Sequence, residues 1–186
     1  GEVSDPQPET ALTALIGGNE TAKEVSNESE LTAAIADTNV NTVKLAGDIS
    51  ISSSLTVNRT VTLDLNGHVL KYESANKGSV IVVEGSGKLT LTDSNTAAEH
   101  KFMPGTNGLW VLDEENGKET VTGGVITGGT GYPIQFGSGY TAYYGGAVYI
   151  KSGGKLTMEG GNIVGCTTAY GYGGGVYVID GGAFEM

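Results

Sequence analysis

Residues 146–158, GAVYIKSGGKLTM, recur in outline at residues 174–186, GGVYVIDGGAFEM. Each stretch alternates apolar residues with polar or aromatic ones, turns at a pair of glycines, and alternates again. Residues 81–91, IVVEGSGKLTL, align with both stretches without a gap. Alternation with a period of two over three to five residues indicates a β-strand rather than a helix. The repeated stretch therefore predicts two short strands joined by a glycine turn.

Two more alternating segments, around residues 63 and 121, extend the alignment. One column of the repeat then contains five apolar residues, which are Leu63, Leu91, Val121, Met158 and Met186, separated by 28, 30, 37 and 28 positions. A third short apolar segment follows at 123–128, GGVITG, and at 162–165, NIVG. Three short strands in a repeat of roughly 28 residues predict an all-β fold, a right-handed parallel β-helix (solenoid) whose stacked coils share one core.

The repeat departs from its regular length in one place and from its pattern in another. Residues 128–145, GGTGYPIQFGSGYTAYYG, lengthen the connection after the third strand. Because insertions at one corner of a repeat protein usually carry its binding surface, we expect function there. The unit around Val121 fits the pattern least well, since Glu119 falls at a position that points inward elsewhere. We expect a distorted strand or a shifted turn at that unit.

A single convincing helix precedes the coils, at residues 27–37. Asn27 is a suitable N-cap, and Glu30 stands three residues later, which is the spacing of a capping box. An apolar stripe on one face consists of Leu31, Ala34 and Ile35. Since the open end of a solenoid exposes core and unpaired strands, we expect this helix to cap the N-terminal end. A partner-binding helix is the alternative.

These elements divide the chain into an irregular linker at 1–21 and a β-helix domain at 22–186, with coils from about residue 43 to residue 186. The last repeat stops in the middle of a coil, at Met186. An open coil leaves parallel strands unpaired and core side chains exposed. We therefore expect either a fragment of a longer array, truncated at its C-terminus, or end-to-end packing in which another molecule covers the last coil.

The composition disfavours several classes of partner. The formal net charge is −11 and Arg59 is the only arginine, so the chain is poorly suited to neutralise the phosphates of a nucleic acid. The same charge disfavours an anionic membrane surface. No apolar run approaches the ~18 residues of a membrane span, and no cofactor is expected. The single cysteine, Cys166, excludes a disulfide framework and is expected to be a small core residue.

Residues 29–70, SELTAAIADTNVNTVKLAGDISISSSLTVNRTVTLDLNGHVL, resemble the opening of pectate-lyase-like right-handed β-helix domains in large bacterial cell-surface proteins and adhesins. The later phrases GGAVYI, SGGKLTMEGGNIVG and GGGVYV resemble the glycine-rich repeats of the same class, common in surface proteins of gut bacteria. The resemblance begins near residue 25. It implies the β-helix fold and a secreted or cell-surface location, with any signal and anchor outside these residues. Function stays open, because such folds serve as lyases, hydrolases, carbohydrate-binding modules, adhesins and stalks.

An enzyme of this class would need charged residues that the sequence does not place together. The resemblance implies that a lyase uses acidic residues holding calcium and a basic side chain, but Arg59 lies in a tight turn and is interpreted as solvated. It implies that a hydrolase uses aspartates on adjacent coils. Asp64 is expected to be outward and exposed, however, and Asp93 is one position out of register. His68 belongs to a structural turn and His100 to an irregular stretch, so we expect no catalytic residue.

A loop at 113–117, DEENG, supplies several oxygen ligands of the kind that calcium prefers. The carboxylates are those of Asp113, Glu114 and Glu115. The loop lacks the spacing of an EF-hand and of the calcium-binding nonapeptide repeat. It is therefore a weak calcium candidate, and a solvated acidic turn is the alternative.

Eight of the nine tyrosines fall in the last third of the chain. Tyr149 and Tyr177 occupy the same column of adjacent coils, between inward apolar residues, and are expected to point outward. Exposed tyrosines offer a flat apolar face and a polar tip, which suits sugar rings and protein partners. The candidate binding residues are Tyr149, Tyr177, Tyr143, Tyr144, Tyr170 and Tyr172. An aromatic ladder that only stabilises the coils is the alternative.

The sequence thus predicts a non-catalytic, adhesin-like or carbohydrate-binding module. Its negative charge favours a neutral glycan, or a basic patch on a host or cell-surface protein, over an anionic polymer such as pectate. Two alternatives stay open. One is a structural stalk that spaces another domain from the cell, and the other is a fragment of a polysaccharide lyase or glycoside hydrolase.

Overall fold

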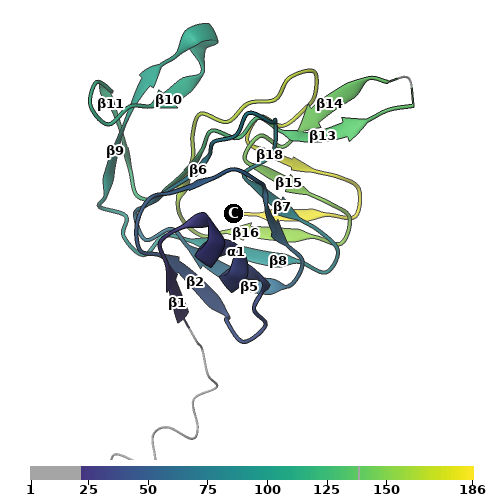
Figure 1. Ribbon diagram of the computed structural model, residues 1–186, viewed down its shortest axis with the longest axis horizontal. Coiled ribbons are helices and arrows are strands. Elements are labelled where there is room, and N and C mark those ends of the chain that lie inside the picture. Colours follow the sequence, from purple (N-terminus) through teal and green to yellow (C-terminus); the bar gives the residue numbers. More distant parts are fainter. Residues whose placement is uncertain (1–21, 138) are drawn as a thin grey trace, which may run out of the picture.

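The structure is a computed structural model that describes residues 22–137 and 139–186. The linker predicted at 1–21 lies outside the described residues. Strands of three parallel sheets follow one another in a fixed order along the chain, so that each set of three makes one coil (Figure 1). β1 (Ala22–Val25) precedes the coils, and the first two coils consist of β2 (Thr42–Leu45), β3 (Ile49–Ile51), β4 (Leu55–Val57), β5 (Thr60–Asp64), β6 (Val69–Tyr72) and β7 (Ile81–Val83).

The later coils continue the same three sheets. They consist of β8 (Lys88–Thr92), β12 (Val125–Thr127), β15 (Val148–Ile150), β16 (Lys155–Met158), β17 (Asn162–Ile163) and β18 (Val176–Val178), followed by β19 (Ala183–Glu185). The strand orders are β1-β2-β5-β8-β16-β19, β17-β12-β6-β3 and β18-β15-β7-β4, with parallel pairing throughout. This arrangement is the predicted parallel β-helix.

The register of the strands matches the alignment of the repeated stretches. Val148 pairs with Ile81 on one side and with Val176 on the other. In the sheet that follows along the chain, Leu156 pairs with Leu89. The stacking of 146–158 between 81–91 and 174–186 is therefore confirmed. A covering of the last coil by another molecule stays a prediction.

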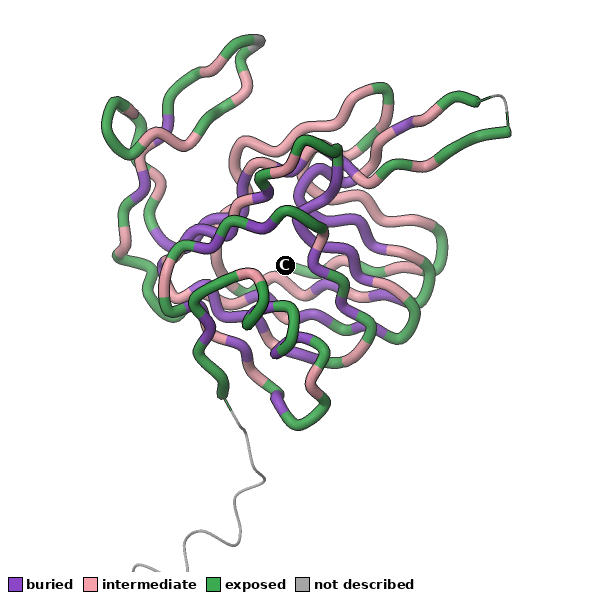
Figure 2. The backbone as a smooth tube through the Cα atoms, in the orientation of Figure 1, coloured by how far each residue is buried: buried purple, intermediate pink, exposed green. Residues whose placement is uncertain are grey.

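The inward-facing side chains of the three sheets form one continuous core, seen in Figure 2 as buried positions along the coil strands. Leu63, Leu91 and Ile150 are fully buried there. Burial of one such side chain contributes about 1.5–3 kcal/mol to folding. Cys166 packs against this core, as predicted, and burial raises the pKa of its thiol to about 11. Because a single coil cannot enclose a core, stability depends on the stacking of coils.

The unit placed around Val121 is not a coil, which corrects the alignment. Leu91 in β8 pairs directly with Met158 in β16, so no other strand of that sheet lies between them. Val121 lies in β11 (Glu119–Thr122), which pairs antiparallel with β9 (Glu99–Pro104) in a separate sheet. Alternation marks any strand with one buried face, so the pattern alone could not separate an inserted strand from a coil strand.

Two insertions interrupt the third coil, each at a different corner (Figure 1). Between β8 and β12 the chain forms β9, a short 3-10 helix (Thr106–Gly108), β10 (Trp110–Leu112) and β11, which together are named here the three-stranded insertion. Between β12 and β15 it forms β13 (Tyr132–Gln135) and β14 (Thr141–Tyr144), named here the hairpin. The sequence predicted the insertion at 128–145, which contains the hairpin. At the other insertion it indicated only a poor fit to the repeat around Val121, for which a distorted strand or a shifted turn was expected.

α1 (Glu28–Ala36) lies over the N-terminal end of the coils, as predicted (Figure 1). Asn27 Oδ1 accepts the N–H of Glu30 at 3.0 Å, and the Glu30 carboxylate accepts the N–H of Ser26 at 2.8 Å. The apolar face of the helix joins the core through Leu31, Ala34 and Ile35.

Before the helix, β1 pairs with β2 and adds a strand that the sequence did not indicate. Among the described residues, no helix has the length and apolar character needed to cross a membrane.

Arg59 fastens α1 to the coils, so its interpretation as a solvated turn residue is wrong. Its Nε donates to the carbonyl oxygen of Ile35 at 2.6 Å, and its Nη2 donates to that of Ala34 at 3.0 Å. The last carbonyl groups of a helix have no partner within the helix. The planar guanidinium satisfies two of them at once. The only arginine of the chain is therefore half-buried and committed to the cap.

Candidate binding surface

Tyr149 and Tyr177 pair in register on adjacent coils, and their side chains lie on the outer face as predicted. Their ring centroids are 6.1 Å apart, with 7° between the ring planes. Tyr132 of the hairpin stacks against Tyr149 with a centroid distance of 4.9 Å, also at 7°. Tyr149 is consequently only 3% exposed, which corrects the expectation of an exposed ring. Each such aromatic pair adds about 0.5–1.5 kcal/mol beyond area burial, so this part of the ladder stabilises the coils.

A second group of aromatic side chains forms a pocket of about 400 Å³, named here the aromatic pocket. It lies between the hairpin and the loop that joins β17 to β18. Tyr170 and Tyr172 are 80% and 68% exposed, and the hydroxyl of Tyr140 donates to the carbonyl oxygen of Tyr170 at 3.0 Å. This bond joins the hairpin to the next coil. The lining residues are Phe136, Tyr140, Ala142, Tyr144, Tyr170 and Tyr172.

The structure brings together three of the six candidate tyrosines, Tyr144, Tyr170 and Tyr172, around this pocket. Tyr177 packs beside them, 4.8 Å from the Tyr144 ring by centroid distance. Tyr143 lies elsewhere, with the ammonium nitrogen of Lys77 4.6 Å from its ring centroid. Sequence reasoning missed Phe136 and Tyr140 as site residues. Their position in the inserted stretch 128–145 was the available signal.

Among the residues that the structure describes, the lining of the aromatic pocket carries no charged side chain, and its side-chain polar atoms are phenol hydroxyls. Desolvation and the neighbouring phenols of Tyr177, Tyr172 and Tyr140 raise the pKa of Tyr144. Its hydroxyl therefore keeps its proton at neutral pH and can donate a hydrogen bond. The pocket offers flat apolar faces with a few hydroxyl groups, which is the chemistry that an uncharged sugar ring requires.

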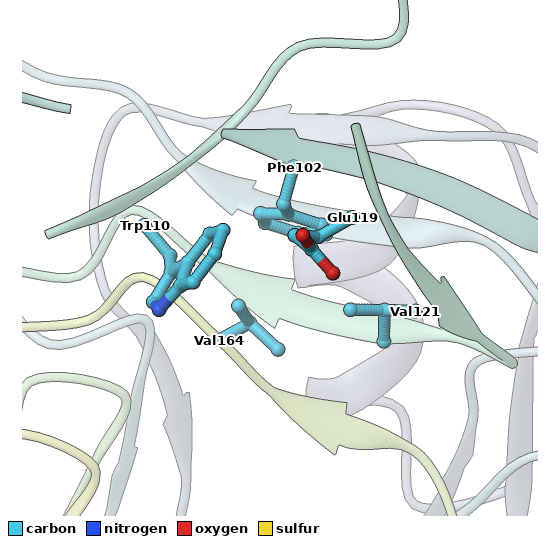
Figure 3. A pocket seen from close by; sticks show the side chains of 5 residues that line it. All are labelled: Phe102, Trp110, Glu119, Val121 and Val164. Atoms are coloured by element: carbon cyan, nitrogen blue, oxygen red, sulfur yellow. The ribbon is translucent and has the colours of Figure 1, made fainter. Parts of the chain in front are cut away.

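The three-stranded insertion forms another pocket against the body of the β-helix, of about 370 Å³ (Figure 3). Its lining residues are Phe102, Trp110, Glu119, Val121 and Val164, and it is named here the tryptophan pocket. The only tryptophan of the chain is 40% exposed there. This pocket was not predicted from the sequence, because the segment around Val121 was assigned to a coil.

His100 anchors the three-stranded insertion to the coils. It lies in β9, not in an irregular stretch as expected, and is only 7% exposed. Its Nδ1 is 2.9 Å from Glu114 Oε1, and its Nε2 is 2.8 Å from the carbonyl oxygen of Gly67. Both neighbours are acceptors, so the doubly protonated imidazolium satisfies both contacts. Burial alone would lower the pKa of His100, but the bonds to Glu114 and Gly67 and the charges of Glu114 and Asp48 raise it overall.

The acidic loop proposed for calcium supports this anchor. Glu114 binds His100 and also accepts the backbone N–H of Lys101 at 3.0 Å. Asp113 Oδ1 accepts the backbone N–H groups of Glu115 and Asn116. Within residues 22–137 and 139–186, no three acidic, histidine or cysteine side chains are grouped to hold a metal ion. Calcium binding by this loop stays a prediction.

We expect the anchoring of the insertion to depend on pH through His100. Because its pKa is raised in the folded state, its contribution is complete below its unfolded pKa near 6.5 and is lost as pH rises through the folded pKa. Amide hydrogen exchange of residues 99–122, corrected for intrinsic rates, should therefore show lower protection at about pH 8.5 than at about pH 5.5. His100→Gln should remove this dependence.

His68 provides the matched control, because its Nδ1 lies 3.5 Å from Asp48 Oδ1 but it is outside the insertion. His68→Gln should leave the pH dependence of exchange in place. Protection of 99–122 that does not change with pH in the unmodified protein would overturn the assignment of the anchor to His100.

Asp64 and Asp93 hold the corner from which the insertion leaves the coil. Asp64 was expected to be exposed, but it is buried, with only 8% of its surface exposed. Its Oδ1 accepts the N–H groups of Asn66 and Ser94, each at 2.8 Å. Burial alone would raise the pKa of Asp64, but these hydrogen bonds lower it overall. Asp93 accepts the N–H of Gly67 and, from the other side, a backbone N–H that precedes β12. Both carboxylates are thus occupied by backbone donors.

Three stacked parallel sheets around one core define this chain as a parallel β-helix protein. The chain belongs to the family described as a pectate lyase-like adhesive domain, whose sequence model matches residues 22–174. The description gives the family an adhesive role. No curated protein and no solved structure shows a significant match to the chain.

Proposed function

We propose that this domain is a non-catalytic adhesive module of a bacterial cell surface, and that it binds a neutral glycan in the aromatic pocket. The observation that carries the proposal is the gathering of five exposed or half-exposed aromatic rings from two coils around one uncharged pocket. Sugar rings stack their C–H faces on aromatic rings, and their hydroxyls exchange hydrogen bonds with phenols. The family's adhesive description supports the same function and a surface location.

The charge of the domain bears on which glycan it accepts. With a formal net charge of −11, the domain repels polyuronates such as pectate at long range. The described lining residues, which are uncharged, offer no cation to pair with a carboxylate. A neutral hexose-containing glycan therefore fits better than an acidic one.

The engagement of the charged residues supports a role without catalysis. If the domain were a lyase or a hydrolase of this fold, the candidate catalytic residues would be Arg59, Asp64 and Asp93. Their polar atoms bind backbone groups of the coils and of α1. A general acid, base or calcium ligand needs a carboxylate that faces substrate rather than the fold.

The direct test is a glycan array that displays neutral glycans and uronate glycans and is probed with the intact domain. For a neutral glycan that binds, we expect Tyr172→Ala and Phe136→Ala each to weaken binding at least tenfold, about 1.4 kcal/mol, measured by titration calorimetry. Tyr172 is 68% exposed and Phe136 is 46% exposed, so the fold should persist in both variants, and circular dichroism checks it.

Tyr143→Ala is the matched control, because Tyr143 is next to Tyr144 in sequence but outside the pocket. It should bind the glycan as the unmodified domain does. If no glycan on the array is bound, the proposed glycan binding is wrong and the alternative function, a structural stalk, is favoured. The stack of Tyr132, Tyr149 and Tyr177, which stabilises the coils, is consistent with that alternative. Turnover of a uronate polymer would show an enzyme instead.

A further inference from the structure

The tryptophan pocket differs from the aromatic pocket in one decisive respect, because a carboxylate faces it. Figure 3 shows the indole ring of Trp110 and the carboxylate of Glu119 turned toward the same space, with Val164 and Val121 close by. We propose that this pocket binds a lysine or arginine side chain of a partner protein. The aliphatic stem would lie on the apolar lining, with the cation between the indole face and the carboxylate.

The polarity of the lining selects this ligand over a sugar. Among the described residues that line the pocket, Glu119 has the only charged side chain, and the other side chains are apolar or aromatic, namely those of Phe102, Trp110, Val121 and Val164. A sugar carries hydroxyl groups around its whole ring, and a pocket with one carboxylate would leave most of them without partners. A lysine or arginine side chain has the matching distribution, since an apolar stem ends in a single cationic group.

The charge of Glu119 is available to such a ligand. In the part of the chain that the structure describes, no ion pair or hydrogen bond involves its carboxylate, whereas Glu99 and Glu114 are paired with Lys101 and His100. A cation over an indole face gains further attraction from the ring. The net charge of −11 attracts a basic surface at longer range.

The floor of the pocket is fixed before any ligand arrives. Phe102 is 1% exposed and forms a small apolar cluster with Val69 and Val125 of the coils. Val121 and Val164 pack against that cluster. A Cβ at Gly165 would collide with the carbonyl group of Trp110, so β10 approaches the coil beneath it closely at this point. A preformed pocket spares the ordering cost of binding.

A short peptide tests the proposal, with the sequence acetyl-Ala-Ala-Lys-Ala-Ala-amide as the probe. Trp110 is the only tryptophan, so its fluorescence reports on the pocket directly. We expect the lysine peptide to shift this fluorescence in a saturable way that weakens with salt. The same peptide with an acetylated lysine keeps the stem but loses the charge, and should bind about tenfold more weakly or not at all.

Glu119→Gln should weaken binding of the lysine peptide about fivefold to tenfold. Glu115→Gln is the matched control, because it removes the same charge from the same insertion but does not line the pocket. Equal losses in the two variants, or equal binding of the lysine and acetyl-lysine peptides, would overturn the proposal. The result is independent of the glycan site, since Tyr172→Ala should bind the lysine peptide normally.

Discussion

Gly146→Ala is expected to lower the free energy of unfolding by about 3 kcal/mol or more. A Cβ at this position would press on the carbonyl oxygen of Gly174 in the next coil and lie 2.6 Å from the carbonyl oxygen of Thr167. Gly129 stands in the same relation to the carbonyl oxygen of Gly146. All of these neighbours are backbone atoms, so no side chain can rotate away. Urea denaturation followed by circular dichroism measures the loss.

A glycine in the next repeat supplies the control. A Cβ at Gly175 would meet only Ile163 Cγ2, at an ordinary contact distance of 3.7 Å. Gly175→Ala should therefore change the free energy of unfolding by no more than about 0.5 kcal/mol. Similar losses in both variants would show that the close stacking of coils is not what requires glycine at residue 146.

Asp93→Ala is expected to lower the free energy of unfolding by about 2–4 kcal/mol, because it leaves two backbone donors without their charged partner. Asp93 Oδ1 accepts the N–H of Gly67 at 2.6 Å, and Oδ2 accepts the N–H of Gly124 at 2.7 Å. The carbonyl oxygen of Gly67 also contacts Nε2 of His100, which anchors the three-stranded insertion. The variant should therefore loosen that insertion as well. Denaturation measures the first effect, and hydrogen exchange of residues 99–122 measures the second.

Asp180 is the matched control, since it is an exposed aspartate in a turn of the last repeat. Asp180→Ala should leave stability within about 0.5 kcal/mol of the unmodified domain. If Asp93→Ala behaved in the same way, the two hydrogen bonds would have to be replaced by water at no cost, and the role given to Asp93 would be wrong.

Most of the coil architecture could be predicted from the sequence, because it depends on local alternation and on glycine turns of constant length. The stacking of Ile81, Val148 and Val176 follows from aligning three stretches. The helix follows from a cap and an apolar stripe. The insertion around Val121 could not be recognised, because its strands have the same period as coil strands and differ only in their partners.

The candidate site was predicted in part, for a related reason. Sequence position showed that the tyrosines gather in the last third of the chain, and register placed Tyr149 on the outer face. Neither the sequence position nor the register could show that the hairpin folds back and stacks Tyr132 on the ring of Tyr149. Nor could they show that Trp110 and Val164, from the insertion and from the next coil, share one pocket. Both contacts depend on how an inserted segment returns to the body.

The order of strands in the first sheet also determines how the domain carries a mechanical load. β1 and β19 are the outermost strands of that sheet, at opposite ends of the stack. The hydrogen bonds between coils run across the strands and therefore along the direction of the stack. A pull applied between these two strands loads the interfaces between coils in series, not in parallel. The weakest interface, rather than their sum, sets the tension that the domain can bear.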